Sequence, residues 1–274
     1  MSAPTDMIAI RVALMVLFYT TVHNCISALV PWIVPHGVLK ELCRRDRIMI
    51  PEKFCSTLHA VITGTLAAYV IFVQREFHQQ DQLYHYPKLL DWALPHLAGY
   101  SVYDMGTMYL QGGWGPEVWL HHAMTTYTPV AMMLYRTGAI GVVYLMLVEF
   151  TAPFQNGVWF YQKIVRPALH PHIPRTSWRS HHDPVYSMLL FLRAISFVVF
   201  RAWVSLHLWR TLPFLRSHLT NPKRWFGVAD QPEPFLMPGY LLQYWALVML
   251  SGVWMVLTFA AWVREYRKPI GKLH

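Results

Sequence analysis

The chain has 274 residues, of which 55% are hydrophobic and 14% are charged, whereas soluble domains are about 25% charged. Its 23 Lys and Arg against 14 Asp and Glu give a net charge of +9, and 12 Trp, 15 Tyr and 14 Phe add aromatic bulk. This combination is expected of a polytopic membrane protein, and it excludes disordered, collagen-like and disulfide-scaffold classes.

Seven stretches are apolar and long enough to predict transmembrane helices, which need about 20 residues each. The first, 8–34, exceeds a signal-peptide core, so we expect a retained helix rather than a cleaved signal. The others are predicted at 54–73, 92–110, 118–135, 139–159, 185–209 and 234–263. The sequence contains no internal repeat and no soluble domain, so one all-α bundle is expected.

The positions of Lys and Arg predict the orientation, because positive charge is retained on the cytoplasmic side. With the N-terminus outside or lumenal, the cytoplasmic segments hold 13 Lys and Arg and the opposite segments hold 7. A cytosolic C-terminus is therefore predicted. These charges lie in short loops between apolar runs, so they do not indicate a nucleic-acid partner.

Four successive predicted helices carry polar or ionisable groups: His59, Asp104, the pair His121 and His122, and Glu149. An ionised side chain at a helix centre costs about 2.5–3.5 kcal/mol on insertion scales. Inward-pointing groups on neighbouring helices therefore predict one intramembrane site. The alternative is that a backbone carbonyl or a lipid headgroup satisfies each group separately.

The adjacent histidines diverge by about 100° on a helix, so only one of them is expected to face the site directly. Thr125 and Thr126 follow one turn later and can bond back to the helix or to an imidazole. A neutral imidazole in an apolar cavity can act as a general base toward a hydroxyl or amine, or accept an acyl group. A nearby carboxylate of Asp104 or Glu149 would fix its tautomer.

Four segments, in this order and spacing, are similar to the TLC domain: Ser56–Ala60, Gly99–Met105, His121–Thr125 and Glu149–Asn156. Ceramide synthases, translocon-associated relatives and small TLC-domain-containing proteins share this domain, and the last segment most resembles the small proteins of the fourth-member type. The resemblance covers about 45–268, leaving an N-terminal helix in 1–44 and a tail at 269–274. It implies six helices around a lipid-accessible cavity, plus the first helix, in the endoplasmic reticulum or a related membrane.

The resemblance also implies a chemistry. The signature histidines of ceramide synthases serve acyl transfer from acyl-CoA; His121 and His122 match them, and Tyr103 and Asp104 match the preceding aromatic–acid position. Glu149 stands roughly where those enzymes carry paired aspartates, so acylation of a sphingoid base is not expected. The implied function is acyl transfer from acyl-CoA to another lipid acceptor. The alternative is a non-enzymatic module that binds a lipid or a membrane-protein partner and regulates lipid composition or trafficking.

Arg193 and Arg201 lie eight residues apart, roughly on one side of their predicted helix. They could meet Asp104, Glu149 or a phosphate at the cavity mouth, or snorkel separately toward the headgroups. The predicted catalytic residues are therefore His121, His122, Asp104 and Glu149, and the predicted substrate-binding residues are His59, Tyr103, Arg193 and Arg201.

No metal site is predicted. No two of the 15 histidines are four or five residues apart, which excludes the clusters of di-iron desaturases. A Pro-rich loop carries His170, His172, His181 and His182, and it could bind a metal, although a solvated loop explains the same composition. The cysteines, Cys25, Cys43 and Cys55, lack metal-type spacing.

Overall fold

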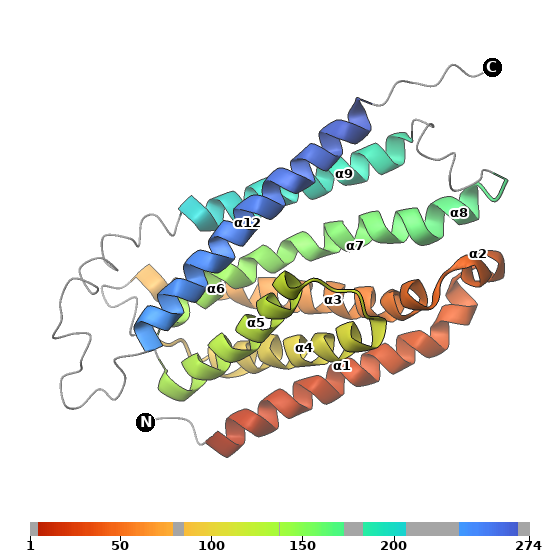
Figure 1. Cartoon of the computed structure of the whole chain (residues 1–274). Helices are drawn as coiled ribbons and strands as arrows, with labels where there is room; N and C mark the ends of the chain where they lie inside the picture. The colour runs from red at the N-terminus through yellow and green to blue at the C-terminus, as the bar shows by residue number, and fades with distance from the viewer. Residues whose placement is uncertain (1–4, 79–84, 137, 173–182, 207–235, 268–274) are drawn as a thin grey trace, which may run out of the picture.

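A computed structural model describes residues 5–78, 85–136, 138–172, 183–206 and 236–267. These residues form helices and connecting turns with no strand, which confirms the all-α prediction. The helices run roughly parallel or antiparallel as one elongated bundle, in which the first helix begins at one end and the last helix ends at the other (Figure 1).

Each of the seven predicted apolar stretches corresponds to a long helix or to a continuous run of helices. These are α1 (Thr5–Ile33), α3 (Arg44–Ala68), α4 (Leu90–Gln111), α5 (Pro116–Tyr135), the run α6 (Ala139–Leu147), α7 (Ala152–Phe160) and α8 (Arg166–Leu169), then α9 (Pro184–Phe197) and α12 (Leu236–Tyr266). A short helix, α2 (His36–Glu41), follows α1. Non-α turns extend or join these helices at Tyr69–Val73, Glu76–His78, Val148–Thr151, Tyr161–Val165 and Val198–Ala202.

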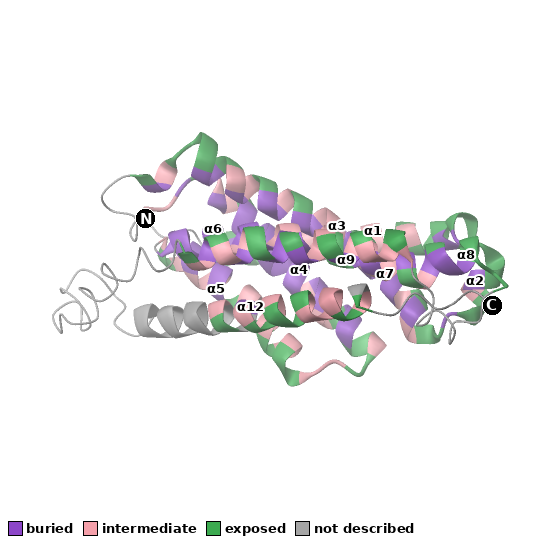
Figure 2. Cartoon of the chain, turned by 90° about the horizontal axis from the view of Figure 1, so that it is seen from above, coloured by how far each residue is buried: buried purple, intermediate pink, exposed green. Residues whose placement is uncertain are grey.

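In the described part of the chain, three helical segments are both long enough and apolar enough to cross a membrane: Thr5–Ile33, Arg44–Val73 and Pro184–Leu206. The helices α4 and α5 carry Asp104 and the histidine pair, respectively, among their apolar residues. Exposed residues lie on the outward faces of the helices and buried residues on the inward faces (Figure 2). Many of the exposed residues are large and apolar, such as Leu17, Trp32 and Tyr109. This is the arrangement of an integral membrane protein, whose outer surface faces lipid.

Local sequence signals explain where the helices begin and end. Asp183 caps α9 by accepting a hydrogen bond from the Tyr186 N–H at 3.0 Å. Between α4 and α5, Gly112 and Gly113 adopt positive φ angles of 66° and 70°, a backbone region that glycine enters at little cost. The sharp turn returns α5 antiparallel to α4 and brings the histidine pair beside Asp104.

Two glycines allow helices to approach closely. A Cβ at Gly99 would collide with the Met15 side chain and lie 2.9 Å from the Val12 carbonyl oxygen, so α4 packs tightly against α1. A Cβ at Gly64 would lie 2.8 Å from the Phe150 ring. Small residues serve this purpose at helix interfaces in membranes.

Two boundaries differ clearly from the prediction, and one is the end of the helical run that begins with α6, which continues to Leu169, ten residues beyond the predicted end at residue 159. The third helix of the chain, α3, begins at Arg44, ten residues before the predicted start at residue 54. Its first turn consists of four charged residues, Arg44, Arg45, Asp46 and Arg47, which interrupt an apolar run, and Pro51 lies within the helix. Apolarity alone therefore missed the polar end of this helix.

Candidate functional site

The centre of the candidate site is a contact between α4 and α5. The Nε2 atom of His122 lies 3.0 Å from Oδ2 of Asp104, and both side chains are largely buried. The other carboxylate oxygen, Oδ1, accepts a hydrogen bond from the Thr107 hydroxyl at 3.1 Å. Asp104 therefore holds the imidazole of His122 with Nε2 facing the carboxylate, the carboxylate–histidine arrangement that fixes a tautomer.

His121 points in a different direction, as adjacent residues on a helix must. Its ring lies 5.7 Å from the Trp254 ring of α12 and 5.2 Å from that of His122, measured between centroids. The Nδ1 atoms of both histidines are buried and have no hydrogen-bond partner among the described residues. Each imidazole thus has one nitrogen without a partner in the described part of the chain, and of the two only His121 lines a cavity.

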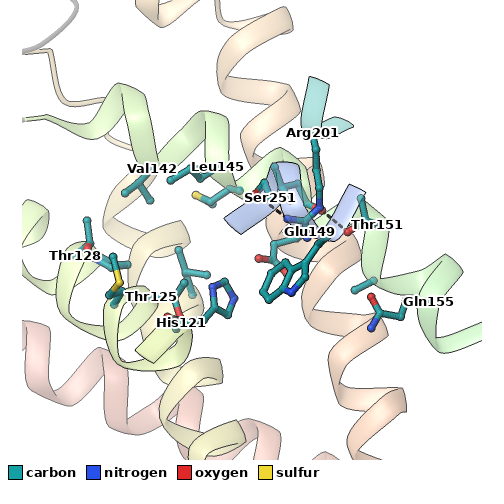
Figure 3. Close-up of a pocket in the computed structure, with 17 residues that line it drawn as sticks. His121, Thr125, Thr128, Val142, Leu145, Glu149, Thr151, Gln155, Arg201 and Ser251 are labelled. Carbon is teal, nitrogen blue, oxygen red and sulfur yellow. Dashed lines mark hydrogen bonds between the residues drawn. The ribbon is translucent and has the colours of Figure 1, made fainter. Parts of the chain in front are cut away.

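A cavity of about 130 Å³ lies beside His121. Apolar side chains from α4, α5 and α6 form one wall, while His121, Glu149 and Arg201 bring ionisable groups to it (Figure 3). Thr125, which also lines the cavity, donates to the His121 carbonyl at 3.1 Å, and Thr126 donates to the His122 carbonyl at 2.9 Å. Both threonines therefore bond back to their own helix.

The position of Glu149 follows from the proline that comes after it. Pro153 has no N–H to donate to the Glu149 carbonyl, and the Ala152 N–H donates to that carbonyl instead. The chain tightens into a 3₁₀ turn over Val148–Thr151 between α6 and α7. Such a turn within a helix often marks a functional or strained site, and here it presents Glu149 to the cavity.

Arg201 reaches the same cavity from a π-helical turn, Val198–Ala202, which continues α9. Its Nη1 donates to the Ser251 hydroxyl of α12 at 2.7 Å. The π turn changes the helical register, and Arg193, one of the predicted substrate-binding residues, is not among the residues that line the cavity. The two arginines expected on one side are therefore separated.

His59 and Tyr103 also lie outside the cavity lining. The His59 ring stacks on Tyr100 with centroids 3.8 Å apart, while the Tyr103 hydroxyl lies 2.7 Å from Nδ1 of His23 on α1. Both belong to a second polar network, which packs between α1, α3 and α4. Tyr103 is adjacent to Asp104 in sequence, so the rotation of about 100° per residue turns it toward α1.

The second network contains residues that the sequence analysis did not identify. The Tyr19 hydroxyl lies 2.6 Å from Nε2 of His96, and the Thr63 hydroxyl lies 3.1 Å from Nδ1 of His96 and 3.2 Å from Nδ1 of His59. Polar groups in a membrane protein that bond across helices in this way hold the helices together. The available sequence signal for Tyr19 was its position beside Thr20, Thr21 and His23 in a mostly apolar helix.

Glu52 is a further carboxylate that sequence reasoning missed. It is buried near the start of α3, where its Oε2 lies 3.0 Å from Nζ of Lys53. It interacts electrostatically with both Asp104 and His122. The residue was assigned to a basic loop, so no apolar helix drew attention to it.

Metal binding finds no support in the described part of the chain, because no three His, Cys, Asp or Glu side chains there are arranged to hold an ion. His170 and His172 are exposed, and His181 and His182 lie outside the described residues. The chemical groups gathered at the cavity are instead imidazole, carboxylate and guanidinium, which suit proton transfer and the binding of a carbonyl or carboxylate.

Comparison with known proteins gives one family. A family model described as the TLC domain matches residues 50–260, which is more than half of the chain and contains every residue that lines the cavity. None of the curated proteins matches the sequence.

Proposed function

The chain belongs to the TLC domain family, and we propose that it transfers an acyl group from acyl-CoA to the hydroxyl or amine of a membrane lipid. One observation carries this proposal: His121 lines a cavity within the helical bundle, beside a second histidine that Asp104 holds at 3.0 Å. Intramembrane ionisable groups are costly, and such a cluster marks a functional site more often than a structural one.

In the proposed reaction, His121 is the catalytic residue that contacts the substrate. It takes the proton from the acceptor while the acceptor oxygen or nitrogen forms its new bond to the acyl carbonyl carbon. The carbon–sulfur bond then breaks, and the proton passes from His121 to the departing thiolate, which leaves as CoA. An ester or amide and free CoA are the products, so all atoms are accounted for.

The surrounding carboxylates favour a proton on this histidine pair, whereas the positive charge of Arg201 opposes a proton on His121. Asp104 interacts electrostatically with both imidazoles, and Glu149 and Glu52 interact with His122. A positive charge that develops on the pair during proton transfer is stabilised by these carboxylates, which already lie in place. His122 and Asp104 are accordingly positioning residues for His121.

The proposal includes a location and an orientation. Residence in the endoplasmic reticulum or a related membrane follows from the family resemblance, and a cytosolic C-terminus follows from the excess of Lys and Arg on that side. The N-terminal and C-terminal ends of the described chain lie at opposite ends of the bundle (Figure 1), as an odd number of membrane crossings requires.

A second candidate function involves no catalysis: the protein binds a lipid or a membrane-protein partner and thereby regulates membrane lipid composition or trafficking. The cavity volume favours it, since about 130 Å³ is below the roughly 300–1,000 Å³ of common small-molecule pockets. A space of this size accommodates the polar end and the first methylenes of one lipid chain, but not both an acyl-CoA and a lipid acceptor in full.

The test is lipidomics in cells that lack the endogenous gene and express the wild type, His121→Ala or His122→Ala at equal abundance. Catalysis predicts that His121→Ala abolishes a lipid product that the wild type restores, because a general base contributes about 10²–10⁴-fold in rate. His122→Ala should reduce the same product less severely.

Thr126→Val is the matched control, since Thr126 lies on the same helix and bonds only to its own backbone. It should leave the product at the wild-type level. Restoration of the wild-type lipid profile by both abundant histidine variants would contradict catalysis and favour the lipid-binding function.

A further inference from the structure

Arg201 is a cation within a membrane-spanning segment, and only 9% of its surface is exposed. Burial of a charge at this depth is costly unless a partner or ligand compensates it. The immediate neighbours of its guanidinium are neutral: Ser251 accepts one hydrogen bond at 2.7 Å, and the Phe197 and Trp254 ring centroids lie 4.6 and 5.1 Å away. These contacts hold the guanidinium in place and leave most of its donors available.

Within the described part of the chain, Glu149 is the opposite charge that interacts with Arg201 electrostatically. The two side chains form no hydrogen bond or ion pair with each other, although both line the cavity and are drawn in Figure 3. In addition, Nε of Arg201 has no hydrogen-bond partner among the described residues. Both charges therefore face a shared space, and a ligand in that space can meet each of them.

The opposite part of the lining is apolar, with side chains such as Leu97, Met124, Val142 and Leu145. A ligand that satisfies both parts needs an oxygen acceptor at one end and a hydrocarbon chain at the other. Guanidinium donors match a carbonyl or carboxylate oxygen well. The volume of about 130 Å³ fits such a group with a few methylenes better than a phosphorylated headgroup.

We propose that Arg201 and Ser251 bind the carbonyl or carboxylate oxygen of a long-chain acyl group, whose hydrocarbon chain lies along the apolar wall. This assignment rests on the proposed function, which places an acyl group in the same cavity. The assignment fixes the orientation of the substrates in the cavity: the acyl oxygen lies at Arg201, and the acceptor group lies at His121 and Glu149. The acyl group belongs to a free fatty acid or to a thioester.

The experiment measures competition against a photoreactive palmitate analogue that is cross-linked to the purified full-length protein. Palmitate, palmitoyl-CoA and hexadecanol serve as competitors, because they share a chain and differ in the oxygen group. In the wild type, palmitate or palmitoyl-CoA should compete at least about tenfold better than hexadecanol, since hydrogen bonds to a charged group contribute about 1.5–3 kcal/mol. Preference for palmitate identifies the free acid, and preference for palmitoyl-CoA identifies the thioester.

Arg201→Gln should lower the affinity for the preferred competitor about tenfold or more and leave the affinity for hexadecanol unchanged. Ser251→Ala should lower the affinity for the preferred competitor several-fold. Arg264→Gln is the control, because Arg264 is exposed near the end of α12 and lies outside the cavity lining. Equal competition by all three compounds in the wild type would overturn the assignment, and this result does not depend on the folding of any variant. Unchanged binding of the preferred competitor by Arg201→Gln would also overturn it.

The outcome is separable from that of the acyl-transfer proposal. Binding that depends on Arg201, in a protein that forms no product from palmitoyl-CoA, would support the assignment and contradict acyl transfer. Product formation that Arg201→Gln leaves unchanged would contradict the assignment alone.

Discussion

Removal of the Thr63 hydroxyl should destabilise the bundle through the second polar network. Thr63 is 0% exposed on α3, and its hydroxyl lies 3.2 Å from the His59 imidazole on the same helix and 3.1 Å from the His96 imidazole on α4. Valine has nearly the same shape but no hydroxyl, so Thr63→Val leaves one nitrogen of each imidazole without its partner.

The expected magnitude follows from these two contacts. A buried polar atom left unsatisfied costs about 1–3 kcal/mol, while hydrogen bonds between membrane helices average about 0.6 kcal/mol because the reference state also finds partners. We therefore expect a loss of about 1–3 kcal/mol in the free energy of unfolding. For a chain of this size, the loss corresponds to a decrease of roughly 2–10 °C in the unfolding temperature.

Intrinsic tryptophan fluorescence during heating of the purified protein in detergent measures this shift. Thr20→Val is the matched control, because Thr20 is exposed on α1 and its hydroxyl donates only to the Val16 carbonyl of its own helix. The control should unfold within about 1 °C of the wild type. If Thr63→Val behaves like this control, the network does not stabilise the bundle and the reasoning is wrong.

Three further predictions address the site, the packing and the topology. Asp104→Asn keeps the side-chain volume and removes the charge beside His122. Product formation from labelled palmitoyl-CoA should fall at least about tenfold while the abundance of the protein is unchanged. Undiminished turnover would show that Asp104 does not position the histidine pair. Gly99→Leu forces a side chain against Met15 and the Val12 carbonyl, so the yield of monodisperse protein in size-exclusion chromatography should drop sharply, and a normal yield would contradict the close packing of α1 on α4. Tags at the two termini of the protein in intact vesicles should differ in protease access, with the C-terminal tag on the cytosolic side; equal access would contradict the orientation.

The lengths of the apolar runs were sufficient to predict the fold. Each of the seven stretches became a helix or a continuous run of helices, because a membrane-spanning segment must satisfy its backbone hydrogen bonds internally. The angular separation of His121 and His122 was also predictable, since it depends only on helix geometry. The structure shows one of them at the cavity and the other at Asp104.

The rotation of each helix about its axis could not be predicted from the spacing of polar residues. His59 and Tyr103 were expected at the cavity, yet they pack toward α1, because several polar faces occur on α3 and α4. The register between Arg193 and Arg201 depends on a π turn that has no clear sequence signal. Glu52 was overlooked because its charged neighbours were assigned to a loop, whereas α3 begins at Arg44.

The most direct test of acyl transfer is incubation of the purified protein in lipid vesicles with isotopically labelled palmitoyl-CoA, followed by mass spectrometry of the lipids and of free CoA. We predict a labelled ester or amide together with an equal amount of CoA from the wild type, and neither from His121→Ala. Hydrolysis to free palmitate alone, or equal product from wild type and His121→Ala, would contradict the claim that the cavity histidine transfers an acyl group to a lipid.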